Sequence, residues 1–247
     1  MSDQASTIMV NTLEPQSGTT LTVGKSGQNL QVNADSLKAN VAKDAGGNAI
    51  FTSNGSGTLS GLNSAFGSAQ TLIQSQTASS SASISFTSGI DSTYKEYIFE
   101  FINIRPATDG GLFSFQANVD GGSGFDETLT STWFHARHTE SNSVAQLSYG
   151  ASFDQAQGTA YQSFSYDAQN GADECLCGEL HIFNPASTTY VKNWYAQVNE
   201  NIRNGTGGSS NNFVAGYFNT TSAIDEFSFK ISSGNIADGT IKMYGIK

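Results

Sequence analysis

The chain has 247 residues, with 11 Lys and Arg against 21 Asp and Glu and a formal net charge of -10. Only 13% of the residues are charged, glycine is frequent (26) and proline is scarce (3). This balance argues against nucleic-acid binding, which needs clustered cations, and no segment is apolar for long enough to be inserted in a membrane. The first residues lack the cationic and apolar stretches of a secretory signal peptide. We therefore expect a protein made in the cytoplasm.

The aromatic residues divide the chain into two regions. Nearly all of the 16 Phe, 9 Tyr and 2 Trp residues follow position 80, and only Phe51 and Phe66 precede it. A segment with so few large side chains cannot close a core of its own. Its apolar residues still recur two positions apart, as in short strands with one apolar face. These pairs are Ile8 and Val10, Leu21 and Val23, and Leu30 and Val32.

For residues 1–75 we therefore expect an elongated β shaft in which three chains around an axis bury what one chain cannot. A flexible Gly/Ser linker is the alternative interpretation. Residues 76–88 are expected to be a serine-rich hinge followed by a first strand at 83–86.

Residues 89–247 repeat a short aromatic or β-branched run followed by a turn, and no helical pattern stands out. Such spacing predicts an all-β domain, an antiparallel sandwich that resembles a jelly roll. The turns carry Asp-Gly or Asn-Gly pairs, which favour tight reversals. The predicted strands are 97–104, 112–119, 128–135, 144–153, 161–166, 177–183, 191–198, 212–218, 224–231 and 240–244.

Three stretches of the chain resemble one family of proteins. TIMVNTLEPQSGTTLTVGKSG (7–27) is similar to the opening of fibre-type proteins of bacteriophages that infect aquatic bacteria. GIDSTYKEYIFEFINIRPATD (89–109) resembles the first strands of their C-terminal domain, and SSGNIADGTIKMYGIK (232–247) resembles its last hairpin. The stretches cover about a quarter of the chain, and they occur in the same order as in the family.

The resemblance implies a virion structural protein, made in the bacterial host, that assembles as a homotrimer. It also implies that the N-terminal segment docks on a tail or capsid protein, with the apolar residues Ile8, Val10, Leu13, Leu21 and Val23 as candidates for attachment. The domain beyond would be a tail-fibre head that binds a host-surface glycan. Because the chain is short for a tail fibre, a head fibre or a capsid decoration (cement) protein is the alternative. A free lectin or a depolymerase is a more distant one.

The cysteine, histidine and acidic residues show no spacing typical of a metal site or a catalytic site. Cys175, Cys177 and His181 alternate along one predicted strand, but their spacing is not one used for zinc. The acidic residues mostly adjoin Gly, Ser or Asn and are typical of turns. We therefore expect no enzymatic activity, no catalytic residues, no cofactor and no metal.

The aromatic residues offer the strongest candidate for binding. Adjacent aromatic residues on a strand point to opposite faces, so one member of each pair must leave its own core for solvent, a neighbouring subunit or a ligand. Exposed rings can stack on the C–H face of a sugar. The candidates for such a platform are Trp133, Phe134, Trp194, Tyr195 and Tyr217.

Overall fold

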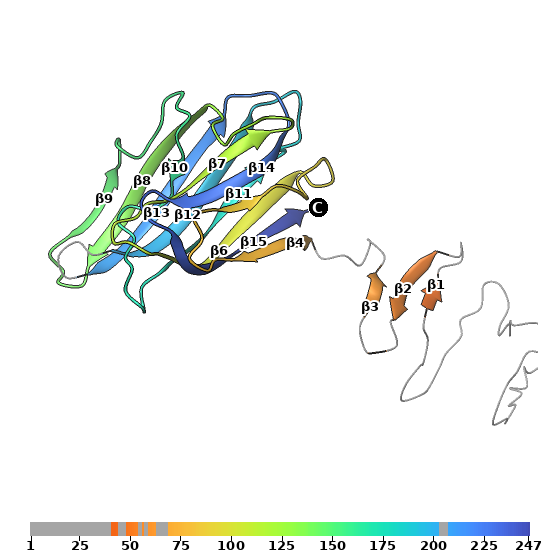
Figure 1. Ribbon diagram of the computed structural model, residues 1–247, viewed down its shortest axis with the longest axis horizontal. Helices are drawn as coiled ribbons and strands as arrows, with labels where there is room; N and C mark the ends of the chain where they lie inside the picture. The colour runs from red at the N-terminus through yellow and green to blue at the C-terminus, as the bar shows by residue number, and fades with distance from the viewer. Residues whose placement is uncertain (1–40, 44–47, 54–55, 57–58, 63–68, 203–206) are drawn as a thin grey trace, which may run out of the picture. The chain divides into compact units, whose positions relative to one another are not determined.

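The computed structural model describes residues 41–43, 48–53, 56, 59–62, 69–202 and 207–247. These residues contain strands and no helix, and every paired strand is antiparallel, which confirms the all-β prediction. The described residues also contain no helix that is long and apolar enough to cross a membrane. The chain divides into two compact units, Met1–Ser64 and Ala65–Lys247 (Figure 1).

The first unit contains a three-stranded sheet in the order β1 (Val41–Lys43), β2 (Ala49–Ser53) and β3 (Leu59–Leu62). Phe51 lies on its central strand, in register with Ala42 on one side and Leu62 on the other. The predicted shaft strands and attachment residues lie outside the described residues, so both stay predictions. The attachment residues are Ile8, Val10, Leu13, Leu21 and Val23.

The second unit, called the head below, contains two antiparallel sheets. The large sheet has eight strands, in the order β4 (Gln70–Thr77), β15 (Ile236–Ile246), β6 (Glu96–Pro106), β11 (Leu176–Phe183), β12 (Lys192–Ile202), β13 (Gly208–Phe218), β8 (Leu129–Thr139) and β9 (Ala145–Tyr149). The small sheet has four, in the order β10 (Gln162–Ser163), β7 (Phe113–Val119), β14 (Ile224–Ile231) and β5 (Ile84–Phe86).

The two sheets share one core of packed aromatic rings. Phe99 of the large sheet lies 5.2 Å from Phe86 and 5.4 Å from Phe227 of the small sheet, measured between ring centroids. Phe115 of the small sheet meets Trp194 of the large sheet at 5.0 Å. Edge-to-face ring pairs of this kind add to the hydrophobic stabilisation of burial. The face of the large sheet that packs on these rings is called the inner face below, and the opposite one the outer face.

The head begins earlier in the chain than the sequence predicted. Gln70–Thr77, placed in the shaft and hinge from its sequence, forms strand β4 and pairs with β15 along its length. Ile84–Phe86 forms a strand as expected, but in the small sheet, where it pairs with β14. Period-two patterning identifies a strand without naming its partner, and β15 is far away in sequence.

Candidate ligand-binding surface

Strand alternation on the large sheet sorts the two predicted aromatic pairs. Trp194 is 2% exposed and faces the core, while its neighbour Tyr195 is 42% exposed on the outer face. Trp133 and Phe134 divide in the same way, at 0% and 40%. The structure therefore removes both tryptophans from the predicted platform, because the core takes the larger apolar ring of each pair. Tyr217 lies half-buried beside Tyr195.

Three strands carry an aromatic flank on the outer face. Phe134 of β8 and Phe213 of β13 are register partners whose rings stack at 5.0 Å between centroids, with 9° between their planes. Tyr149 of the edge strand β9 is the register partner of Phe134 on its other side and is 56% exposed. Exposed apolar rings grouped in this way mark surfaces that bind another molecule. Sequence reasoning had not singled out Phe213 or Tyr149.

Tyr195 lies at the middle of the outer face and is held in place by its neighbours on β11. Its ring stacks on His181 at 4.5 Å between centroids with 11° between the planes, and Phe183 lies 5.9 Å away. The Nδ1 of His181 lies 2.6 Å from a carboxylate oxygen of Glu96. Burial, together with the charges of Glu96 and Glu179, raises the pKa of Tyr195. The phenol therefore keeps its proton and can donate a hydrogen bond.

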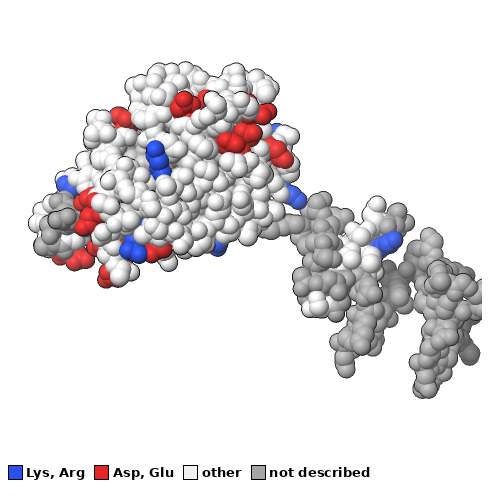
Figure 2. Space-filling model, in the orientation of Figure 1, with Lys and Arg blue, Asp and Glu red and all other residues white. Residues whose placement is uncertain are grey.

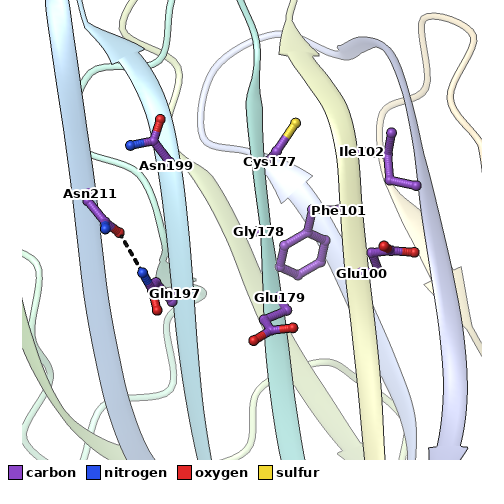
Figure 3. Close-up of a pocket in the computed structure, with 9 residues that line it drawn as sticks. All are labelled: Glu100, Phe101, Ile102, Cys177, Gly178, Glu179, Gln197, Asn199 and Asn211. Carbon is purple, nitrogen blue, oxygen red and sulfur yellow. Dashed lines mark hydrogen bonds between the residues drawn. The ribbon is translucent and has the colours of Figure 1, made fainter. Parts of the chain in front are cut away.

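A polar hollow adjoins these rings on β6, β11, β12 and β13 (Figure 3). Gln197 donates a hydrogen bond to the side-chain oxygen of Asn211 at 3.3 Å, and Asn199 lies on the same side of the hollow. Glu100 and Glu179, which are register partners, carry the opposite side. Amides donate and accept hydrogen bonds and carboxylates accept them, so the hollow suits a ligand rich in hydroxyl groups.

Shared lining residues connect this hollow with two others into one surface, called the sheet-face groove. Gln197 lines both the polar hollow and a hollow with Phe134, Tyr195 and Phe213. Tyr195 also lines a third hollow, together with Phe183, Asn193 and Tyr217. The groove residues used below are Glu100, Phe134, Glu179, Phe183, Asn193, Tyr195, Gln197, Asn199, Asn211, Phe213 and Tyr217.

The cysteines and histidines have other partners. The Sγ atoms of Cys175 and Cys177 lie 3.7 Å and 3.5 Å from the side-chain oxygen of Asn103. His181 is engaged by Glu96, and His135 lies 3.1 Å from the Ser210 hydroxyl. Among the residues that the structure describes, no three His, Cys, Asp or Glu side chains are grouped so that they could hold a metal ion.

A buried carboxylate on the inner face was missed from the sequence. Glu200 is 1% exposed and accepts hydrogen bonds from the Tyr166 backbone N–H at 2.5 Å and from the Asn212 amide at 2.7 Å. Burial raises the pKa of Glu200 to about 7, although these hydrogen bonds act in the opposite direction. The available signal was its place in the inner register of β12, two residues from the buried Val198 and Ile202.

The groove pairs apolar ring faces with neutral amides and carboxylates. Ligand sites commonly combine apolar walls with a few polar groups that fix orientation. Such a surface matches a molecule with C–H faces and many hydroxyl groups. Figure 2 shows one face of the molecule, on which most of the surface is uncharged and the acidic side chains lie in small groups.

Comparisons of the chain with protein-family models, with curated proteins and with solved structures find no match. No relative therefore bears on the function.

Proposed function

We propose that this chain is a structural protein of a bacteriophage virion, a homotrimeric tail fibre. In this proposal residues 1–75 anchor and trimerise the fibre, and the head presents the sheet-face groove to a glycan on the host surface. The sequence resemblance supports the virion assignment. The groove, with exposed rings next to amides and carboxylates, is the single observation that supports glycan binding.

One feature of the fold supports the finer architecture that we propose, a jelly-roll-like head. β6 and β7 follow each other in the chain, as do β14 and β15, and the two strand pairs run together through both sheets. In the large sheet β6 pairs with β15, and in the small sheet β7 pairs with β14. Antiparallel strands that cross together from one sheet to the other are typical of rolled β-sandwiches.

Trimerisation would raise the overall affinity of the fibre for its glycan. A shallow surface binds a single glycan weakly, but three linked copies raise the overall affinity by about 10²–10⁴-fold when all three sites can engage. The acidic and mostly neutral-polar surface limits non-specific adhesion to other anionic surfaces. A fibre of this kind binds reversibly until several grooves are occupied.

Locating the chain in the intact particle by cryo-electron microscopy tests the virion proposal. We expect a few trimers at the tail, each with its N-terminal segment against a tail protein. Many copies on the shell would instead identify a head fibre or a capsid decoration protein. Absence of the chain from the particle would overturn the proposal.

A further inference from the structure

We propose that the sheet-face groove binds a neutral oligosaccharide that lies along β12, and that it rejects glycans carrying carboxylate, sulfate or phosphate groups. This inference rests on the proposed glycan binding and adds the size and the charge of the ligand. Three observations carry it: the length of the exposed line of side chains on β12, the change in chemistry along that line, and the charge of the neighbouring flank.

The outer face of β12 presents five evenly spaced side chains, and the first four of them line the groove. Asn193, Tyr195, Gln197 and Asn199 alternate with buried residues, and all four are exposed. At 3.3–3.4 Å per residue, the line from Asn193 to Asn199 is about 20 Å long. A single sugar ring cannot contact both of its ends. The groove therefore fits a chain of several sugar units.

The chemistry changes from one end of this line to the other. Around Tyr195 the neighbours are the rings of Phe134, Phe183 and Phe213. At the other end the neighbours are polar, since Glu179 of β11 is the register partner of Gln197 and Asn211 of β13 is that of Asn199. Sugar units at the first end would stack on rings, and those at the second end would donate hydroxyl hydrogen bonds to amide and carboxylate oxygens. Only a ligand long enough to reach both ends could use the ring stacking and the hydrogen bonding together.

Three carboxylates form an acidic flank on the side of the groove away from β8, β9 and β13, the strands that carry Phe134, Tyr149 and Phe213. They are Glu96 and Glu100 of β6 and Glu179 of β11. Lys242 lies 3.7 Å from the Glu100 carboxylate, and His181 lies between the other two. Even if His181 is protonated, these five groups leave the flank negative. None of the groove-lining residues is a lysine or an arginine.

An anionic glycan bound along β12 would bring its charges beside this flank, where Lys242 and His181 are already paired with the carboxylates. Like charges in partly desolvated sites repel each other appreciably, and mobile salt screens the repulsion. A neutral glycan avoids the repulsion and supplies hydroxyl donors for the same carboxylates. The flank therefore selects the ligand by charge.

A binding series with the full-length protein tests size and charge together. The probes are neutral gluco-, manno- and galacto-oligosaccharides from single sugars to hexasaccharides, compared with oligogalacturonates of matched length. We expect affinity to increase with length for at least one neutral series and to be about tenfold or more weaker for the acidic series at low salt. The difference should shrink at high salt.

The possible results separate the two proposals. Equal or tighter binding of the oligogalacturonates, or affinity that does not change with chain length, overturns this inference while glycan binding stands. Failure of all the saccharides to bind overturns the glycan-binding proposal and the inference with it.

The variant Glu179→Gln sharpens the test of charge, because its side chain is half-exposed and the change keeps its size. We expect the affinity for oligogalacturonate to rise several-fold, with less change for the neutral series. Glu226→Gln is the matched control, since Glu226 accepts a hydrogen bond from Asn118 within the small sheet. Unchanged discrimination in Glu179→Gln would contradict the role of the flank.

Discussion

The two faces of the large sheet use the same residue types for different purposes. On the inner face, Trp194 and Phe99 are buried against the small sheet and stabilise the fold. On the outer face, Tyr195 and Phe134 are about two-fifths exposed and pack mainly on their neighbours within the sheet. One residue along a strand separates a structural ring from one available to a ligand. Substitutions on the inner face should therefore change stability, and those on the outer face should change binding.

The largest expected effect is the loss of an inner ring. Trp194→Ala removes a side chain that meets Phe115 and Phe218 in the core, so we expect the free energy of unfolding to fall by about 3–5 kcal/mol. Chemical denaturation followed by circular dichroism measures it. If Trp194→Ala lowered the free energy of unfolding as little as the outer-face variant Tyr195→Ala, the two faces would not differ in their contribution to stability.

Glu200 tests whether the inner face tolerates a charge. Because its pKa is raised from 4.5 to about 7 in the folded state, the folded protein binds the proton more tightly than the unfolded chain. The contribution of Glu200 to the free energy of unfolding should therefore be greatest below pH 4.5 and fall by roughly 3 kcal/mol as the pH rises to about 7 and above.

Glu200→Gln cannot ionise, so it should remove most of this pH dependence, as measured by denaturant unfolding at a series of pH values. Glu226→Gln, a substitution on the small sheet, should retain the dependence of the parent protein. An unchanged pH profile in Glu200→Gln would place the titrating group elsewhere.

Tyr195→Ala should separate binding from stability. The ring stacks on His181 at the surface, so we expect a loss of about 1 kcal/mol or less in the free energy of unfolding. The affinity for a glycan ligand should fall at least tenfold, since stacking on aromatic rings is lost. Differential scanning calorimetry and isothermal titration calorimetry measure the two quantities. A stability loss that equals that of Trp194→Ala would contradict the assignment.

The smallest effect concerns the stacked pair Phe134 and Phe213. Cross-strand aromatic pairs contribute about 0.2–1 kcal/mol, so a double-mutant cycle with Phe134→Ala and Phe213→Ala should give a coupling energy in that range. Coupling of several kcal/mol would indicate that this flank is part of the stabilising core, as on the inner face.

The sequence predicted the strands of the head better than it predicted its surface. All ten strands expected in residues 89–247 overlap observed ones, because the runs of β-branched and aromatic residues were clear. Alternation also predicted that one ring of each pair leaves the core. It did not predict that Tyr195 and Phe134 would be those rings, because a period of two divides the residues between two faces without identifying the inner one.

Contacts between residues that are distant in the sequence could not be predicted from it. Phe213 joins Phe134 only because β13 pairs with β8, and Glu179 joins Glu100 only because β11 pairs with β6. β4 was divided between the predicted shaft and hinge, and its partner β15 could not be found from local patterns because it lies at the other end of the chain. Local patterns specify strands, and the pairing that builds the groove depends on contacts distant in sequence.

Titration of the intact protein with the neutral oligosaccharide series tests the central claim most directly, when Tyr195→Ala is compared with Tyr161→Ala. Tyr161 lies against Lys230 of the small sheet, which makes it a matched control outside the groove. We predict that the parent protein and Tyr161→Ala bind alike and that Tyr195→Ala, folded with a nearly unchanged melting temperature, binds at least tenfold more weakly. Equal binding by both variants, or no binding by the parent protein, would contradict the claim that the outer face of the large sheet is the ligand-binding surface.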